Sequence, residues 1–319
     1  MSARDVLGRA VVEAIERYGD KTFEFRAILA DEVAHELLGA AKARSQEEVA
    51  TMALGLRGIG VWMREFGDAT PEEAAAALDF VVVAGHTRNG RANRSAEALA
   101  WIARFRELGG KVWVYDWLPT PAMGAAHLPE LVAWAKSIGA LGVMADLEPD
   151  AGWRTAVGPA TVYAQTLAQL TRAADLKSGY TDYGRGGNSD AVMRAVLAEV
   201  DVGVPQSYDP DGTDLGDEAY HERSVAYWRE RGAKCVVLGY GVWLRNAHRH
   251  RTDLELQQHL GGISRIPAGI CGAIGWYASP GLRPRLATLK ALRPPAARRS
   301  LLDLLTPFGA ALRDEMDCC

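Results

Sequence analysis

Cysteine, basic charge and long apolar runs are all scarce in this sequence. Its 319 residues include 4 cysteines, too few to hold a chain of this length together as a disulfide framework. Cys235 and Cys271 each begin an apolar run, which predicts two core thiols, whereas Cys318 and Cys319 end the chain. Because 40 acidic residues outnumber 36 basic ones, the charge gives no electrostatic footprint for nucleic acid.

The two ends of the chain carry amphipathic patterns but no membrane signal. No apolar run approaches the roughly 20 residues of a membrane-spanning helix, and residues 3–18 lack the apolar core of a signal peptide. We therefore expect a protein that is cytoplasmic as synthesised and that is delivered outside, or carried on a phage or similar particle, if its substrate lies there. Residues 1–50 are predicted to form a helical N-terminal extension and residues 296–319 an amphipathic tail. Either could dock on a larger protein assembly.

Eight short apolar runs alternate with longer helical patterns over residues 51–295. One of the helices is expected to open at Pro71, which two acidic residues follow. This alternation predicts an α/β protein with a closed (β/α)8 barrel, the TIM barrel. A doubly wound open sheet usually has a Gly-rich turn after its first strand, and residues 63–68 form no such turn. The runs are 57–62, 80–84, 111–115, 141–145, 177–180, 200–204, 235–239 and 271–276.

Two carboxylates, Asp146 and Glu148, follow directly on the fourth apolar run. Side chains alternate along a strand, so these two should point the same way, roughly 7 Å apart at their α-carbons. Pro149 cannot continue the hydrogen-bonded ladder, so the strand should end there. Catalytic residues of such barrels lie at the carboxyl ends of the strands, and paired acids suit glycoside cleavage. The alternative interpretation is a solvated strand end with two ordinary surface acids.

The other predicted strand ends are rich in aromatic, carboxylate and amide side chains. Aromatic faces stack on sugar rings, and carboxylates and amides bind hydroxyl and acetamide groups. A metal hydrolase needs convergent His and carboxylate ligands, and only His86 lies at a predicted strand end, so no metal or cofactor is expected. No Gly-x-Ser-x-Gly turn is present. The residues predicted to bind substrate are Trp62, Tyr115, Asp116, Tyr180, Gln206, Tyr240 and Trp276, and Tyr208 is a further candidate at the end of the sixth strand.

Several of these motifs resemble the chitinase-type (family eighteen) glycoside hydrolases. The resemblance covers strands four to eight and rests on Asp146-Leu-Glu148, Gln206-Ser-Tyr-Asp209, Gly239-Tyr-Gly241 and Gly275-Trp276. The full family signature is Asp-x-x-Asp-x-Asp-x-Glu, and this chain has apolar residues, Leu141 and Met144, in place of the first two acids. The lysozyme-like (family twenty-five) muramidases also place Asp-x-Glu on a barrel strand. They usually carry a first-strand Asp that this chain lacks.

The resemblance implies a role for each residue of the motifs. Glu148 would be the general acid that protonates the glycosidic oxygen, with a pKa raised by its apolar surroundings and by Asp146. Asp146 would orient the substrate acetamide, which attacks the anomeric carbon, and Tyr208 would bind that acetamide. Trp276 would lie under the reacting sugar. In the muramidase-like case, Asp146 would instead stabilise the oxocarbenium ion.

The sequence thus predicts a glycoside hydrolase that cleaves an N-acetylated glycan, with peptidoglycan as the preferred substrate and cell wall degradation as its role. The alternative is a catalytically weak barrel that serves as a glycan-binding or structural module in a larger assembly. The replaced acids favour this alternative, and the intact pair of Asp146 and Glu148 opposes it. An aldolase or lyase barrel is disfavoured, because no predicted strand ends in a lysine. The expected partners are therefore a polysaccharide and a protein assembly, without nucleic acid or a membrane span.

Overall fold

The computed structural model describes residues 56–292, except 57, 65, 67–68, 88–89, 209–217, 245–248, 257–269 and 277–282. The predicted N-terminal extension over 1–50 and the tail over 296–319, with Cys318 and Cys319, lie outside the described residues. Among the described helices, none is long and apolar enough to cross a membrane.

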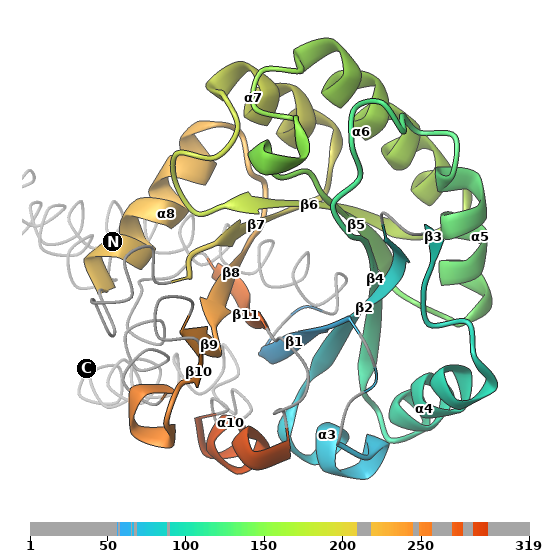
Figure 1. The fold of residues 1–319 in the computed structure, drawn as a ribbon, viewed down its shortest axis with the longest axis vertical. Coiled ribbons are helices and arrows are strands. Elements are labelled where there is room, and N and C mark those ends of the chain that lie inside the picture. The colour runs from blue at the N-terminus through green and yellow to red at the C-terminus, as the bar shows by residue number, and fades with distance from the viewer. Residues whose placement is uncertain are drawn as a thin grey trace, which may run out of the picture.

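Eight parallel strands close into a barrel (Figure 1). β1 pairs with β2 on one side and with β11 on the other, so the sheet has no free edge. All eight predicted runs are strands, and the fourth of them ends at Asp146 as expected. The prediction of a (β/α)8 TIM barrel is therefore confirmed. The barrel strands are β1 (Ile59–Met63), β2 (Phe80–Thr87), β4 (Lys111–Asp116), β5 (Gly142–Asp146), β6 (Lys177–Tyr183), β7 (Val202–Gln206), β8 (Val236–Gly241) and β11 (Ile270–Trp276).

Three two-residue strands were not predicted. β3 (Gly90–Arg91) pairs antiparallel with the end of β2, and β9 (Trp243–Leu244) pairs antiparallel with β10 (Arg249–His250). All three lie in the connections that follow barrel strands, β3 after β2 and the other two after β8. These connections lead away from the carboxyl ends of the strands, where a barrel enzyme carries its active site.

Helices surround the barrel (Figure 1). α3 begins at Pro71, as predicted. Thr70 caps it: the Thr70 side chain accepts a hydrogen bond from the Glu73 amide, and the Glu73 side chain accepts one from the Thr70 amide. Ser95 and Ser189 cap two further helices, where their hydroxyls accept hydrogen bonds from the Ala98 and Val192 amides. The helices are α3 (Pro71–Ala77), α4 (Ala96–Glu107), α5 (Leu128–Ser137), α6 (Val157–Ala173), α7 (Asp190–Glu199), α8 (Glu218–Glu230) and α10 (Leu286–Leu292).

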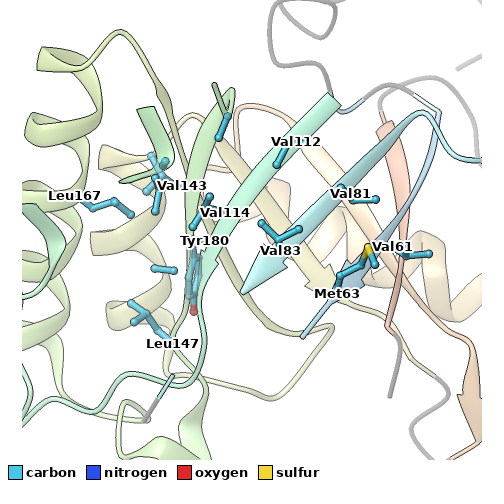
Figure 2. Packing of buried hydrophobic residues seen from close by; sticks show 14 of the residues in the cluster. Val61, Met63, Val81, Val83, Val112, Val114, Val143, Leu147, Leu167 and Tyr180 are labelled. Atoms are coloured by element: carbon cyan, nitrogen blue, oxygen red, sulfur yellow. The ribbon is translucent and has the colours of Figure 1, made fainter. Parts of the chain in front are cut away.

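Alternate strand residues fall into two separate hydrophobic clusters. The outer cluster joins strand residues such as Val112 and Val114 to helix residues such as Leu167 (Figure 2). The inner cluster is made almost entirely of strand residues, Trp113 and Tyr115 among them, and fills the inside of the barrel. Membership of one cluster or the other therefore tells which way each strand side chain points.

Cys235 immediately precedes β8 and is 9% exposed. It takes part in a disulfide bond, so the expectation of a free core thiol is wrong for this residue. A count of cysteines cannot show which of them the fold brings within bonding distance.

Candidate active site

The carboxylate of Asp146 lies inside the barrel at the end of β5. Met144 belongs to the inner cluster and Ala145 to the outer one, so the next alternation turns Asp146 inward. Only 5% of Asp146 is exposed, and its Oδ1 accepts a 2.9 Å hydrogen bond from Nε2 of Gln206. Gln206 ends β7 two residues after Val204 of the inner cluster. Side chains from two strands that are not neighbours therefore meet at the carboxyl end of the barrel.

The surroundings of Asp146 favour its protonated form. Burial raises the pKa of Asp146 well above its usual value, and the charges of Glu148, Asp182 and Asp116 raise it further. The hydrogen bond from Gln206 acts in the opposite direction without offsetting the burial. Asp146 therefore keeps its proton at a pH at which an exposed aspartic acid is ionised. A carboxylic acid of this kind can take part in proton transfer to a substrate.

Glu148 and Tyr208 complete the group around Asp146. Glu148 is half-buried and immediately precedes the one-turn helix η1 (Pro149–Ala151). Burial raises the pKa of the Tyr208 hydroxyl well above its usual value, and the charges of Asp146 and Glu148 raise it further. The Tyr208 hydroxyl consequently remains a hydrogen-bond donor at every physiological pH. We refer to Asp146 and Glu148 as the carboxylate pair.

Two of the other predicted binding residues, Trp62 and Tyr115, point to the inside of the barrel, as Asp146 does. The rings of Trp62 and Tyr115 meet edge to face with centroids 4.9 Å apart, and both belong to the inner cluster. Tyr115 lies within electrostatic reach of Tyr208, whose pKa it also raises. The exposed fractions of Trp62 and Tyr115 are small, 4% and 5%. Trp276 ends β11, but its side chain lies outside the part of the chain that the structure describes.

Asp116 and Tyr240 lie at the carboxyl ends of β4 and β8 as predicted, whereas Tyr180 lies in the middle of β6, and all three side chains turn away from the carboxylate pair. Tyr180 and Tyr240 belong to the outer cluster and are fully buried. Tyr180 packs on the Trp228 ring at 5.1 Å, and the Tyr240 hydroxyl donates to the Gly60 carbonyl at 3.2 Å. Asp116 is also fully buried. These three side chains have no exposed surface for a substrate, so we leave them out of the proposed binding group.

Asp182 is a buried carboxylate that the sequence did not assign to the site. It accepts hydrogen bonds from the Tyr180 hydroxyl at 3.0 Å and from the Tyr183 and Asn188 amides at 2.7 and 2.8 Å. Burial nevertheless raises the pKa of Asp182 to about 7, and the charge of Glu148 contributes to the rise. The only sequence signal for this network is the position of Asp182 two residues after Tyr180 at a strand end.

The raised pKa of Asp182 predicts that stability falls as the pH rises. Between pH 3.8, its ordinary value, and about 7, the folded state holds this proton and the unfolded state does not. The free energy of unfolding should therefore decrease across that window by on the order of 4 kcal/mol and level off above it. In Asp182→Asn, the decrease should be smaller by that amount, as measured by urea unfolding from pH 4 to 8. Asp175→Asn, at an exposed turn, should keep the wild-type slope, and an unchanged slope in Asp182→Asn would contradict this account.

The comparisons with known proteins identify the fold and no family. No family model matches the sequence, and no curated protein matches it. Among solved structures, a double mutant of an endo-beta-1,4-mannanase from Cellulomonas fimi is 15% identical, with a TM-score of 0.50 over 76% of this chain and 73% of that one. An engineered protein is 16% identical, with a TM-score of 0.50 over 77% and 72%. At such low identity the likeness shows the shared barrel fold alone, so the resemblance to families eighteen and twenty-five stays a prediction.

Proposed function

We propose that the protein is a glycoside hydrolase that cleaves N-acetylated glycans. The observation that carries this proposal is the carboxylate pair at the carboxyl end of β5, with the amide of Gln206 and the hydroxyl of Tyr208 beside it. Paired acids with displaced pKa values are the usual means of glycoside cleavage. The Cellulomonas fimi mannanase has the same fold, which makes the fold compatible with glycan cleavage without deciding the substrate.

In the proposed mechanism, the carboxylate pair shares a proton near neutral pH. Glu148 is the more exposed member and is assigned as the general acid, which protonates the glycosidic oxygen as the bond to the leaving sugar breaks. Asp146 lies deeper and is assigned to orient the acetamide of the substrate. The acetamide oxygen attacks the anomeric carbon, so no protein nucleophile is required. Tyr208 donates a hydrogen bond to the acetamide during this step.

Peptidoglycan is the proposed substrate, because it presents N-acetylated sugars that this arrangement would bind. Trp62 and Tyr115 are aromatic residues of the inner cluster, on the same side of the strands as Asp146, and would contact the neighbouring sugar with their small exposed edges. The same proposal includes a role in cell wall degradation, for which the protein would be delivered from inside the cell or carried on a particle.

A glycan-binding or structural module is the second candidate. Met144 is fully buried in the inner cluster, and Leu141 packs against that cluster. An apolar barrel interior therefore occupies the positions at which the chitinase-type signature has its first two acids. A barrel without these acids is expected to bind glycan and cleave it slowly or not at all.

The decisive experiment measures release of new reducing ends from purified peptidoglycan and from chitin oligomers, together with glycan binding. The proposal predicts reducing ends above a no-enzyme control with at least one of the two substrates. Binding without cleavage would support the module instead. If the protein neither binds nor cleaves either substrate, both assignments are excluded.

A further inference from the structure

A second group of convergent polar side chains lies on the helix-facing side of the barrel. Its members are His86 of β2, Asp116 of β4 and His127, which immediately precedes α5. We call these three residues the His–Asp–His cluster. Each offers a nitrogen or oxygen atom, and the three atoms lie within 4.8 Å of one another. His86 and Asp116 were predictable as strand-end residues, whereas His127 belongs to a connection and not to a strand end.

The carboxylate of Asp116 lies between the two imidazoles. Nε2 of His127 is 2.5 Å from Oδ2 of Asp116, and Nδ1 of His86 is 3.3 Å from Oδ1. The two imidazole rings stack, with centroids 4.4 Å apart and planes inclined by 19°. Asp116 is fully buried and His86 is 9% exposed. Three ligand-type groups are therefore held together by three different elements of the fold.

Two buried atoms of the cluster make no hydrogen bond. Nδ1 of His86 and Oδ1 of Asp116 form an ion-pair contact with each other at 3.3 Å, but the contact lacks hydrogen-bond geometry and neither atom has another hydrogen-bond partner. Buried polar atoms nearly always have hydrogen-bond partners, so two such atoms side by side indicate a place for a group that would pair with both. Two ligands of one tetrahedral zinc ion lie about 3.4 Å apart when each bond is about 2.1 Å long. The observed spacing therefore suits a shared cation.

We propose that His86, Asp116 and His127 bind one divalent transition-metal ion, for which zinc is the best match. Two imidazoles and one carboxylate are a usual ligand set for zinc and for related ions, and they leave a position open for water. Calcium and magnesium fit poorly, because they prefer oxygen ligands throughout. On binding, His127 and Asp116 would separate from their present 2.5 Å to the spacing of two ligands.

Tyr163 of α6 supports the proposed site from behind. Its hydroxyl donates a short hydrogen bond to Oδ2 of Asp116. Metal-binding carboxylates are usually oriented by such hydrogen bonds, and removing one typically weakens metal affinity by roughly 10–100-fold. An ion in this place would tie β2 and β4 to the start of α5. This proposal does not depend on the proposed glycan activity.

The test is zinc binding by the full chain after removal of metal with a chelator. Isothermal titration calorimetry should show that the wild type binds one zinc ion. The affinity for this ion should fall by at least about 100-fold in Asp116→Asn and in His127→Gln. Tyr163→Phe should weaken the same ion by roughly 10–100-fold, since it removes only the hydroxyl beside Asp116. His221→Gln is the matched control, because His221 is a buried histidine outside the cluster, and it should keep the wild-type affinity.

Comparing the variants assigns the ion to the cluster rather than to other histidines or cysteines of the chain. Cobalt in place of zinc should give visible absorption bands in the wild type that disappear in His127→Gln. If Asp116→Asn does not fold, His127→Gln gives the same information, because His127 is half-buried and lies at the start of a helix. Absence of zinc binding in the wild type, or an unchanged affinity in His127→Gln, would overturn the proposal.

Discussion

Glu148→Gln should reduce the release of reducing ends from N-acetylated glycan by roughly 10²–10⁴-fold, the usual contribution of a general acid. Glutamine has nearly the same shape as glutamate and can still form hydrogen bonds, but it has no proton to give to the leaving sugar. Glu148 is half-buried, so the substitution should leave the melting temperature and glycan binding close to those of the wild type. The assay is reducing-end release from peptidoglycan and chitin oligomers, run beside thermal melts.

The companion variant Asp146→Asn tests whether the two acids act together. Asp146 and Glu148 lie within electrostatic reach, so replacing the titrating carboxyl of Asp146 with an amide should shift the pH dependence of Glu148. We expect a lower rate and a displaced acid limb of the pH profile. Glu107→Gln, at the exposed end of α4, is the matched control and should keep full activity. Equal rates in the wild type and Glu148→Gln would remove Glu148 from the mechanism.

Trp113→Ala should lower the free energy of unfolding by roughly 3–5 kcal/mol, the range observed when a large aromatic side chain is removed from a core. Trp113 is fully buried in the inner cluster, and its ring lies against Gly142 on the neighbouring strand. The strands of the closed barrel surround the Trp113 ring, so they cannot easily move inward to fill the cavity that its removal would leave. Urea unfolding at one pH measures the loss.

Trp101→Ala is the comparison that isolates the effect of position. Trp101 lies on α4, is only partly buried, stacks on Phe105 at 5.2 Å and donates a hydrogen bond to the Ala69 carbonyl. Water can reach its site after truncation, so the loss should be clearly smaller than for Trp113. Equal losses in the two variants would mean that the inside of the barrel relaxes as freely as its outer layer.

The strands were predictable because each is a short apolar run bounded by turn residues, a signal that survives in a single sequence. Burial on both faces produces this signal, as in Val112 to Tyr115, where outer and inner residues are all apolar. The two-residue strands β3, β9 and β10 carry no such run. Pairing of only two residues depends on where a connection folds back, which no local pattern records.

The candidate site was predictable in part. The inward direction of Asp146 and Gln206 follows from simple alternation, and the structure brings the two together. The same alternation turns Tyr180 and Asp116 outward, which a list of strand ends does not reveal. His127 was missed because it follows Asp116 by 11 residues within a connection, and only the folded path of that connection returns it to the carboxylate.

The seam between β1 and β11 has a consequence for how the protein is made. It joins Ile59 to Ala273, near opposite ends of the described chain, and Tyr240 donates to a carbonyl 180 positions earlier. On the ribosome, β1 therefore emerges long before its second neighbour exists, and one of its edges stays unpaired while most of the barrel is synthesised. Such long-range pairing slows folding and exposes strand edges to aggregation. The yield of folded protein should thus depend on chaperones and on the speed of translation more than the stability of the finished barrel suggests.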